Sequence, residues 1–320
     1  MPSRLTLVWV SLMLGAAVFD LYLWLVTVPA TLCPEECLCD PEGHHVKCSG
    51  TSLNTVPLIQ LTDDRILRLS NCEITLLEKD SFVSLTQLEE LYIYKCGLRT
   101  IELGAFNGLT ELKELHIWSN EISEIIPGTF RSMNSLEYLG LMNNRLEHLD
   151  SDVFSGLLNL KRLTLSENEL QYVHPDTFLR LPKLQQLHLK ENWGLQIPTD
   201  GPFINSHSLL SLDISDCNIS SLSYKTFANV RALKWLDLSD NNLRTVDIYT
   251  LRELPKLSTL YLYGNPLHCD CQLQEVWRWC KERDIQTETE NSAPRCDTPS
   301  EVKGMWWGVL QKEECFGDYV

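Results

Sequence analysis

Leu136-Glu-Tyr-Leu139-Gly-Leu141-Met-Asn-Asn144-Arg-Leu146 is one copy of a motif that recurs through most of the chain. The motif has the form L-x-x-L-x-L-x-x-N-x-L. Its asparagine position returns every 24 residues, with one step of 25, at Cys72, Cys96, Asn120, Asn144, Asn168, Asn192, Cys217, Asn241 and Asn265. A phenylalanine follows most of these positions ten residues later, at Phe82, Phe106, Phe130, Phe154, Phe178 and Phe227. Phe203 follows by eleven residues and Leu251 takes the last such position, so the extra residue lies within 193–198. The asparagine and phenylalanine positions both keep their spacing through nine copies, which indicates a protein built from stacked repeats.

The alternation Leu-x-Leu in each copy predicts a short strand whose side chains point inward and outward in turn. A single copy cannot bury its apolar face, whereas stacked copies bury a continuous core. We therefore expect a curved solenoid with a parallel sheet on its concave side and the phenylalanines on the opposite wall. The asparagine position lies where the chain leaves the strand, and a buried amide there satisfies backbone groups that have no partner in the sheet.

The chain carries a formal net charge of −16. This charge disfavours binding to the phosphates of nucleic acids and to anionic membrane surfaces. It also keeps an elongated protein in solution, which is the simpler interpretation.

The first 30 residues differ from the rest of the chain. Arg4 precedes an apolar run that only Asp20 interrupts, and small residues follow at 28–30. This pattern is typical of a secretory signal, with the mature chain beginning near Thr31. The alternative is an uncleaved anchor, which Asp20 would make costly within a membrane. We expect a secreted chain, unless the sequence is a fragment of a longer protein.

Cysteines gather at the two ends of the repeat array, where an open solenoid needs caps. The first group is Cys33, Cys37, Cys39 and Cys48, and the second is Cys269, Cys271, Cys296 and Cys315. Metal binding is an alternative at the first group, because His44 and His45 lie nearby. A secreted chain with an even number of cysteines favours disulfides, although spacing alone does not fix their pairing.

Sequence motifs beside the cysteines resemble those of a known family. Leu53-Asn-Thr-Val-Pro57 follows the first group, and Asn265-Pro-Leu-His-Cys-Asp-Cys271, Trp277-Arg-Trp279 and Cys296-x-x-Pro299 mark the second. The chain resembles, over residues 31–316, the extracellular leucine-rich repeat proteins with cysteine-rich flanking domains. That group includes Slit, the Nogo receptor, platelet glycoprotein Ib alpha and the variable lymphocyte receptors. These motifs are specific to the architecture and not to one function.

The resemblance implies a right-handed α/β horseshoe with irregular or short helical segments on its convex face. Together with the N-terminal composition, the cysteine groups and the repeat period, it divides the chain into a signal (1–30), an N-terminal cap (31–61), nine repeats (62–267) and a C-terminal cap (268–320). The disulfide pairs that it implies are Cys33–Cys39, Cys37–Cys48, Cys269–Cys296 and Cys271–Cys315. Helical spacing also places Leu273, Val276, Trp277 and Cys280 on one buried face of a cap helix.

Four cysteines remain: Cys72, Cys96, Cys217 and Cys280. Cys72 and Cys96 lie on adjacent turns, but we expect their side chains to project in parallel without converging. Cys217 lies five repeats beyond Cys96, too far for a bond. We therefore predict four buried free thiols and a nearly neutral Cys96→Asn substitution. Intermolecular pairing is the alternative for Cys280.

Two groups of side chains on the predicted concave face are candidates for partner binding. The first group is Tyr92, Tyr94, His116, Trp118, Tyr138 and Met142, and the second is Trp235, Asp237, Tyr261 and Tyr263. Exposed aromatic side chains on neighbouring strands mark interaction sites. For the first group, the alternatives are cross-strand stacking that stabilises the sheet or cover from a cap. For the second group, the alternative is a solvated acidic face whose aromatic residues the cap covers.

No pattern for catalysis or for a cofactor is present, so we expect neither an enzyme nor a bound cofactor. The sequence predicts a module that binds an extracellular or cell-surface protein in adhesion, guidance, receptor function or immune recognition. A matrix scaffold that binds fibrils or glycans is the alternative. Asn218-Ile-Ser220 is an acceptor for N-glycosylation in a secreted chain.

Overall fold

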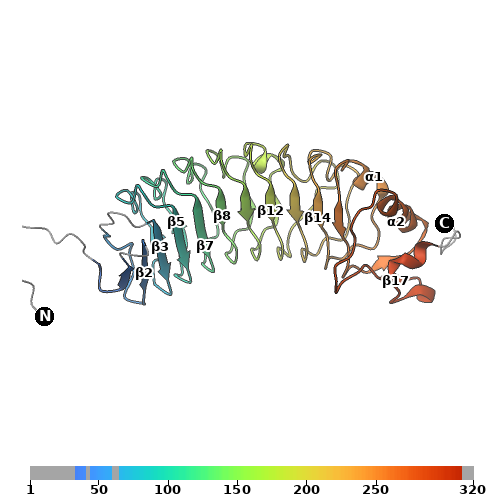
Figure 1. Cartoon of the computed structure of the whole chain (residues 1–320), viewed down its shortest axis with the longest axis horizontal. Coiled ribbons are helices and arrows are strands. Elements are labelled where there is room, and N and C mark those ends of the chain that lie inside the picture. The colour runs from blue at the N-terminus through green and yellow to red at the C-terminus, as the bar shows by residue number, and fades with distance from the viewer. Residues whose placement is uncertain (1–32, 41–43, 60–64, 312–320) are drawn as a thin grey trace, which may run out of the picture. The chain divides into compact units, whose positions relative to one another are not determined.

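A computed structural model describes residues 33–40, 44–59 and 65–311. The described residues form one compact unit, whose strands stand side by side along an arc (Figure 1). The expected signal sequence and Cys315 lie outside the described residues. No helix within the described ranges is long and apolar enough to cross a membrane.

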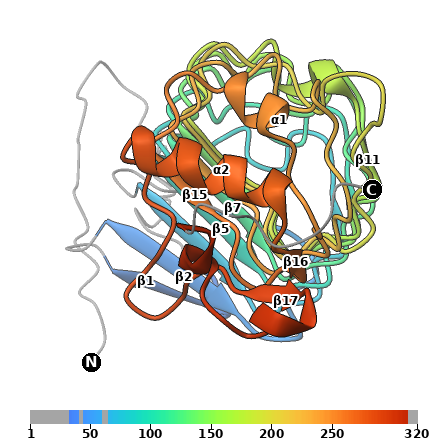
Figure 2. The same ribbon diagram turned by 90° about the vertical axis from the view of Figure 1, so that its right-hand side faces the viewer.

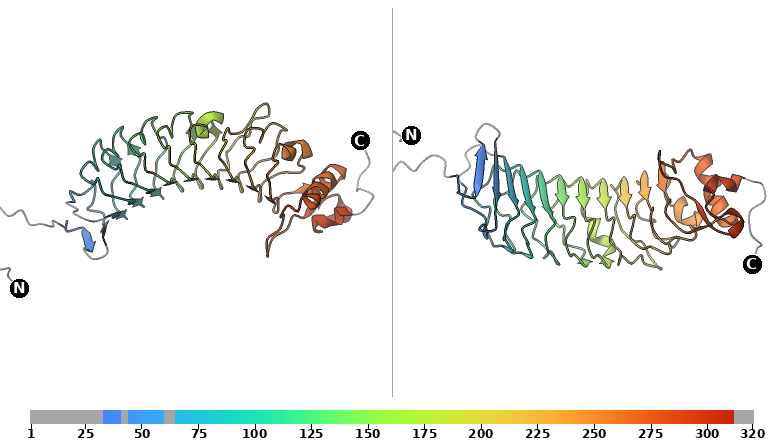
Figure 3. Two further views of the ribbon diagram at one scale, coloured as in Figure 1. Left: turned by 45° about the horizontal axis from the view of Figure 1, so that its top comes forward. Right: turned by 90° about the horizontal axis from the view of Figure 1, so that it is seen from below.

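One sheet runs the length of this unit, along the inner edge of the arc (Figure 3). Nine of its strands are parallel and come one from each repeat: β3 (Ile66–Ser70), β5 (Glu90–Tyr94), β7 (Glu114–Trp118), β8 (Tyr138–Gly140), β10 (Arg162–Thr164), β12 (Gln186–His188), β13 (Ser211–Asp213), β14 (Trp235–Asp237) and β15 (Thr259–Tyr261). Strand β1 (Cys37–Asp40) pairs antiparallel with β2 (His45–Ser49), and β2 joins β3. The predicted parallel solenoid of nine repeats is confirmed.

Register in the sheet follows the leucines. Leu91 pairs with Leu115, and Leu115 with Leu139, so equivalent inward side chains stack directly on one another. These leucines are fully buried. Because side chains alternate across a strand, the same register places the residues between the leucines side by side on the concave surface.

The chain turns sharply just after each strand. The residue before every asparagine position has a positive φ, at Asn71, Lys95, Ser119, Asn143, Glu167, Glu191, Asp216, Asp240 and Gly264. This left-handed conformation is costly for residues other than glycine. Hydrogen bonds made by the next side chain offset that cost.

Buried asparagines connect each turn to the one before it. Asn168 Oδ1 accepts from the amide of Leu146 in the preceding turn at 3.1 Å. Its Nδ2 donates to the carbonyl oxygens of Leu141, Leu165 and Ser166 at 3.0, 2.9 and 3.2 Å. One side chain therefore hydrogen-bonds backbone groups of its own turn and of the preceding turn.

The phenylalanines form a stacked column under the convex surface. Ring centroids of Phe106 and Phe130 lie 5.9 Å apart, and those of Phe130 and Phe154 lie 6.2 Å apart. The convex side carries only short elements: β4 (Leu76–Leu77), β6 (Thr100–Ile101), β9 (His148–Leu149), β11 (Tyr172–Val173), the 3-10 helix η1 (Pro175–Phe178) and α1 (Ile248–Arg252).

A helical cap covers the last repeat (Figure 2). Helix α2 (Cys271–Glu282) is capped by Asp270, whose side chain accepts from the amide of Leu273 at 2.9 Å. Its buried face contains the four residues expected from helical spacing, together with Gln274. Strands β16 (Leu267–His268) and β17 (Cys296–Thr298) and the 3-10 helices η2 (Ser300–Val302) and η3 (Trp307–Gln311) complete the cap.

Disulfides close both ends. The structure contains Cys33–Cys39, Cys37–Cys48 and Cys269–Cys296, which are pairs that the resemblance implied. Cys271 also takes part in a disulfide, and its expected partner, Cys315, lies outside the described residues. Because the four N-terminal cysteines are all bonded, they are unavailable as metal ligands.

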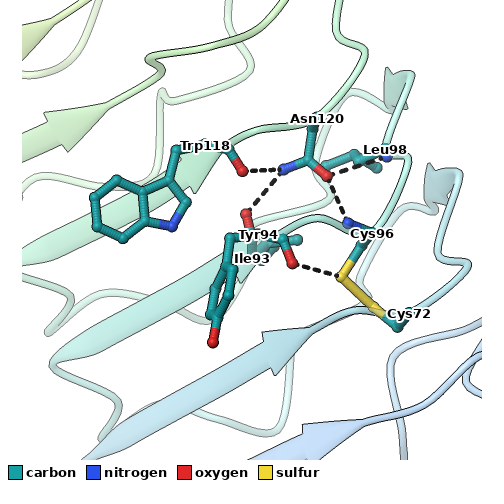
Figure 4. The surroundings of a disulfide bond; sticks show 7 residues. All are labelled: Cys72, Ile93, Tyr94, Cys96, Leu98, Trp118 and Asn120. Carbon is teal, nitrogen blue, oxygen red and sulfur yellow. Dashed lines mark hydrogen bonds between the residues drawn. A yellow bond between two sulfur atoms is a disulfide. The ribbon is translucent and has the colours of Figure 1, made fainter.

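The prediction of four free thiols is wrong for two of them, because Cys72 and Cys96 form a disulfide with their Cα atoms 4.3 Å apart (Figure 4). The expectation that their side chains project in parallel was the error. Asn120 shows the true direction, since its Oδ1 accepts from the amides of Cys96 and Leu98 in the preceding turn at 3.1 and 3.2 Å. A side chain at this position points along the stack, so the sulfur of Cys96 reaches Cys72.

Cys217 and Cys280 are free and buried, as predicted. The Cys217 sulfur lies 3.2 Å from the carbonyl oxygens of both Leu189 and Ser215, and its single S–H donates between them where an asparagine amide donates in other repeats. Burial raises the pKa of each thiol to about 12. Both therefore remain protonated and slow to react at neutral pH.

Candidate functional site

A ladder of side chains crosses the concave face over β3, β5, β7, β8 and β10. The imidazole of His116 lies between two rings, with centroids 4.3 Å from Tyr92 and 4.5 Å from Tyr138. A guanidinium covers each outer ring, that of Arg68 at 4.4 Å from Tyr92 and that of Arg162 at 5.1 Å from Tyr138. We call these five residues the concave ladder.

Gly140 makes the ladder continuous. Tyr138 lies two residues before the position that Tyr92 and His116 occupy on their strands, and Gly140 holds that position on β8. A Cβ on Gly140 would lie 2.9 Å from the Tyr138 ring. The ring of Tyr138 therefore folds over the glycine and stacks on His116.

Two glutamates fix the ladder from the side. The hydroxyl of Tyr92 donates to Glu90 at 2.9 Å, and Nε2 of His116 lies 3.1 Å from Glu114. Burial, then the hydrogen bond to Glu90, raises the pKa of Tyr92 to about 12. Burial lowers the pKa of His116 despite the nearby Glu114 carboxylate, which favours a neutral ring. The Nδ1 atom of His116 is buried without a hydrogen-bond partner among the described residues.

The other members of the first candidate group lie beside the ladder. Tyr94 and Trp118 meet edge to face at 6.4 Å, and Met142 is partly exposed on the turn after β8. Cross-strand stacking, which was the structural alternative for these aromatic residues, is present. It holds the rings in place while Tyr92, Tyr94, Trp118 and Tyr138 remain partly exposed.

The second candidate group is closer to the cap. The rings of Trp235 and Tyr261 meet edge to face at 5.9 Å, and Tyr261 lies 5.8 Å from Tyr263. Gln286, in the chain that follows α2, donates from Nε2 to the Tyr261 hydroxyl at 3.3 Å. The cap thus contacts this group, as the alternative interpretation expected, while all three rings stay partly exposed.

Asp213 and Asp237 pair across β13 and β14, yet their surroundings shift the two pKa values in opposite directions. Each accepts from the amide and hydroxyl of the serine two residues later, Ser215 or Ser239. Burial raises the pKa of Asp213, but hydrogen bonds from His188 and Ser215 outweigh it, and the net pKa is lowered. Burial dominates at Asp237, where the serine bonds offset it only in part and neighbouring carboxylates add to it, so the pKa is raised.

This contrast predicts opposite effects of the same substitution. A carboxyl group whose pKa is lowered in the folded state stabilises the protein above its unfolded-state pKa, and this stabilisation is lost as the pH falls through the folded-state pKa. A carboxyl group whose pKa is raised in the folded state destabilises the protein as the pH rises above its unfolded-state pKa. Asp213→Asn should therefore destabilise the protein at pH 7, and Asp237→Asn should leave it unchanged or more stable. Thermal unfolding of both variants at pH 7 and at about pH 3 measures this, and equal destabilisation at pH 7 would contradict it.

The sequence did not single out several residues that build the ladder. Arg68 and Arg162 of the ladder, and the residues that support it, Glu90, Glu114 and Gly140, were not among the candidates, although each occupies an outward position on a predicted strand. The available signal was the repeat register, which places Arg68, Tyr92 and His116 in one row across three strands. Asn218, the expected glycan acceptor, is exposed in a left-handed turn just beyond Cys217.

Comparisons with known proteins agree with this architecture. The family model described as leucine rich repeat matches residues 87–146, 136–192 and 207–267, which together make up more than half of the chain. The crystal structure of human 5T4 (Wnt-activated inhibitory factor 1, trophoblast glycoprotein) is similar with a TM-score of 0.63 and 25% identity, covering 86% of this chain and 95% of that one.

The TLR13–ssRNA13 complex is also similar, with a TM-score of 0.58 and 23% identity, over 71% of this chain and 37% of the TLR13 chain. No curated protein matches the chain by sequence. The repeat model, the parallel solenoid and the disulfides at its ends lead to one assignment. The chain belongs to the leucine-rich repeat family, with the disulfide-closed architecture of its extracellular members.

Proposed function

We propose that this chain is a secreted or cell-surface module that binds another extracellular protein through the concave ladder and the adjacent Tyr94 and Trp118. The observation that carries the proposal is the continuous row of stacked rings on the concave sheet, with a guanidinium group at each end. Rings fixed before binding lose little conformational entropy when a partner covers them. Tyrosine, tryptophan and arginine are also the residues that contribute most binding energy at protein interfaces.

The charge of the chain and the nature of the face narrow the class of partner. A net charge of −16 disfavours RNA and sulfated glycans as partners. The face offers aromatic surface together with both signs of charge, from Arg68, Arg162, Glu90 and Glu114. Such a surface suits a folded protein that presents apolar side chains with polar neighbours. A glycan at Asn218, on the turn beyond β13, would leave the ladder uncovered.

Alanine substitutions in the concave face test the proposal. Tyr92→Ala and Trp118→Ala are each expected to weaken binding by about 1–3 kcal/mol, because each removes a partly exposed, preorganised ring. Binding is measured by staining cells with the chain fused to an antibody Fc region, with circular dichroism as the folding check.

Exposed aromatics elsewhere provide a matched control. Tyr224 and Tyr249 are 58% and 62% exposed and lie away from the sheet, on the side of the repeats opposite the concave face. The double variant Tyr224→Ala/Tyr249→Ala should stain the same cells as the wild type. If Tyr92→Ala/Trp118→Ala stained them equally well while remaining folded, the concave ladder would not be the binding surface.

A further inference from the structure

An open hollow lies on the edge of the solenoid, away from the concave ladder. It is open to solvent, has a volume of about 630 Å³, and is formed by the turns that follow β10 and β12. Its lining includes Glu167 and Glu169 from one turn and Glu191, Trp193 and Gly194 from the next.

Trp193 is the unusual feature of this hollow. It follows Asn192 directly, at the start of the only repeat with 25 residues. The corresponding residues of the other repeats are Glu73, Gly97, Glu121, Arg145, Glu169, Asn218, Asn242 and Pro266. Trp193 is nevertheless 68% exposed, and within the described ranges its indole has neither an aromatic nor a cationic neighbour. A large aromatic ring in this position therefore contributes little to the core.

Gly194 keeps the space beside the tryptophan open. A Cβ at Gly194 would lie 3.2 Å from Cγ of Gln171 and 3.5 Å from the carbonyl oxygen of Leu170. The backbone here packs closely on the preceding turn, and no side chain fills the hollow from this position. The ring and the neighbouring carboxylates thus border the same open space.

The charged side chains that line the hollow are all acidic. Lys190 pairs with Glu191 at 3.2 Å. Neither Glu167 nor Glu169 forms an ion pair or a side-chain hydrogen bond within the described part of the chain. A cation between these groups would meet carboxylates and the face of a tryptophan, which is the aromatic ring that binds cations best.

We propose that this hollow is a binding site for an arginine side chain of a partner protein. A guanidinium is planar, so it can stack on the Trp193 indole while its edge donates hydrogen bonds to Glu167 and Glu169. The site is independent of the concave ladder, which lies on the sheet and not on this edge. It would give the module a second point of contact that selects partners by charge.

A small peptide tests the site directly. The indole N–H signal of Trp193, in the full chain labelled with 15N-tryptophan, is assigned by its loss in Trp193→Phe. Titration with N-acetyl glycyl-arginyl-glycine amide should shift this signal in a saturable way. The citrulline analogue, which has nearly the same shape without the charge, should not shift it.

Charge-neutral variants identify the carboxylates. Glu167→Gln/Glu169→Gln should weaken binding of the arginine peptide about three- to ten-fold, because these exposed carboxylates supply the ion pairs. Glu111→Gln/Glu124→Gln changes the net charge equally at exposed sites outside the hollow and should leave the affinity unchanged. Unchanged signals from the other tryptophans verify the fold of each variant.

Several results would overturn the proposal. One is an equal response to the citrulline peptide, and another is equal weakening by the control pair. A third is a Trp193 signal that ignores the arginine peptide but moves in Asn218→Gln, the variant without the neighbouring glycan acceptor. That outcome would make a sugar of the chain's own glycan the occupant of the ring.

Discussion

Cys72→Ser/Cys96→Ser is expected to lower the free energy of unfolding by about 2–5 kcal/mol, as the loss of a native disulfide does in secreted domains. The bridge closes a loop with a sequence separation of 24 residues and joins the first two repeats. Without it, the unfolded chain gains conformational freedom. In the folded protein, the turns at these repeats also lack the asparagines that connect the later ones.

A matched variant separates the effect of the disulfide from the effect of the residue type at positions 72 and 96. In Cys72→Asn/Cys96→Asn, the amide at position 96 can accept from backbone amides of the preceding turn, as Asn120 does. We expect this variant to be more stable than the serine variant in denaturant unfolding without reductant. Equal stability of the wild type and the serine variant would refute the account. Alkylation of the denatured, unreduced wild type should label Cys217 and Cys280 and leave Cys72 and Cys96 unlabelled.

Phe130→Ala is expected to cost about 3–5 kcal/mol, because it leaves a cavity in the middle of the phenylalanine column. The Phe130 ring is fully buried, between neighbours at 5.9 and 6.2 Å. Phe130→Leu should cost less, since Leu251 fills the equivalent position of the last repeat and is also fully buried. Leu158→Ala is the control, because that side chain is 54% exposed and such changes stay within about 0.5 kcal/mol. A similar loss in Phe130→Ala and Leu158→Ala would show that the column does not support the stack.

The repeat register predicted most of the fold because each position has one environment in every copy. Leucines at the strand positions and phenylalanines ten residues after the asparagine position can be buried only by stacking in register. The same logic identified the cap helix, since Leu273, Val276, Trp277 and Cys280 share a helical face. These features depend on periodicity, which a single sequence displays directly.

Features that depend on a side chain's direction were harder to predict. Nothing in the spacing of Cys72 and Cys96 shows that side chains at this position lean toward the preceding turn. Tyr138 likewise stacks on His116 only because its ring folds over Gly140. The sequence therefore located the aromatic candidates, while their stacking order and the roles of Arg68, Glu90 and Glu114 needed the structure.

A glycan placed on the concave face tests the functional proposal most directly. Arg162→Asn creates the acceptor sequence N-L-T on β10, beside Tyr138, and Tyr224→Asn creates N-K-T on the side opposite the sheet. Glycan occupancy is verified by mass, and cell staining by the Fc fusion is then compared. We predict that Arg162→Asn abolishes staining and that Tyr224→Asn preserves it. Full staining by a folded, glycosylated Arg162→Asn chain would contradict binding through the concave ladder.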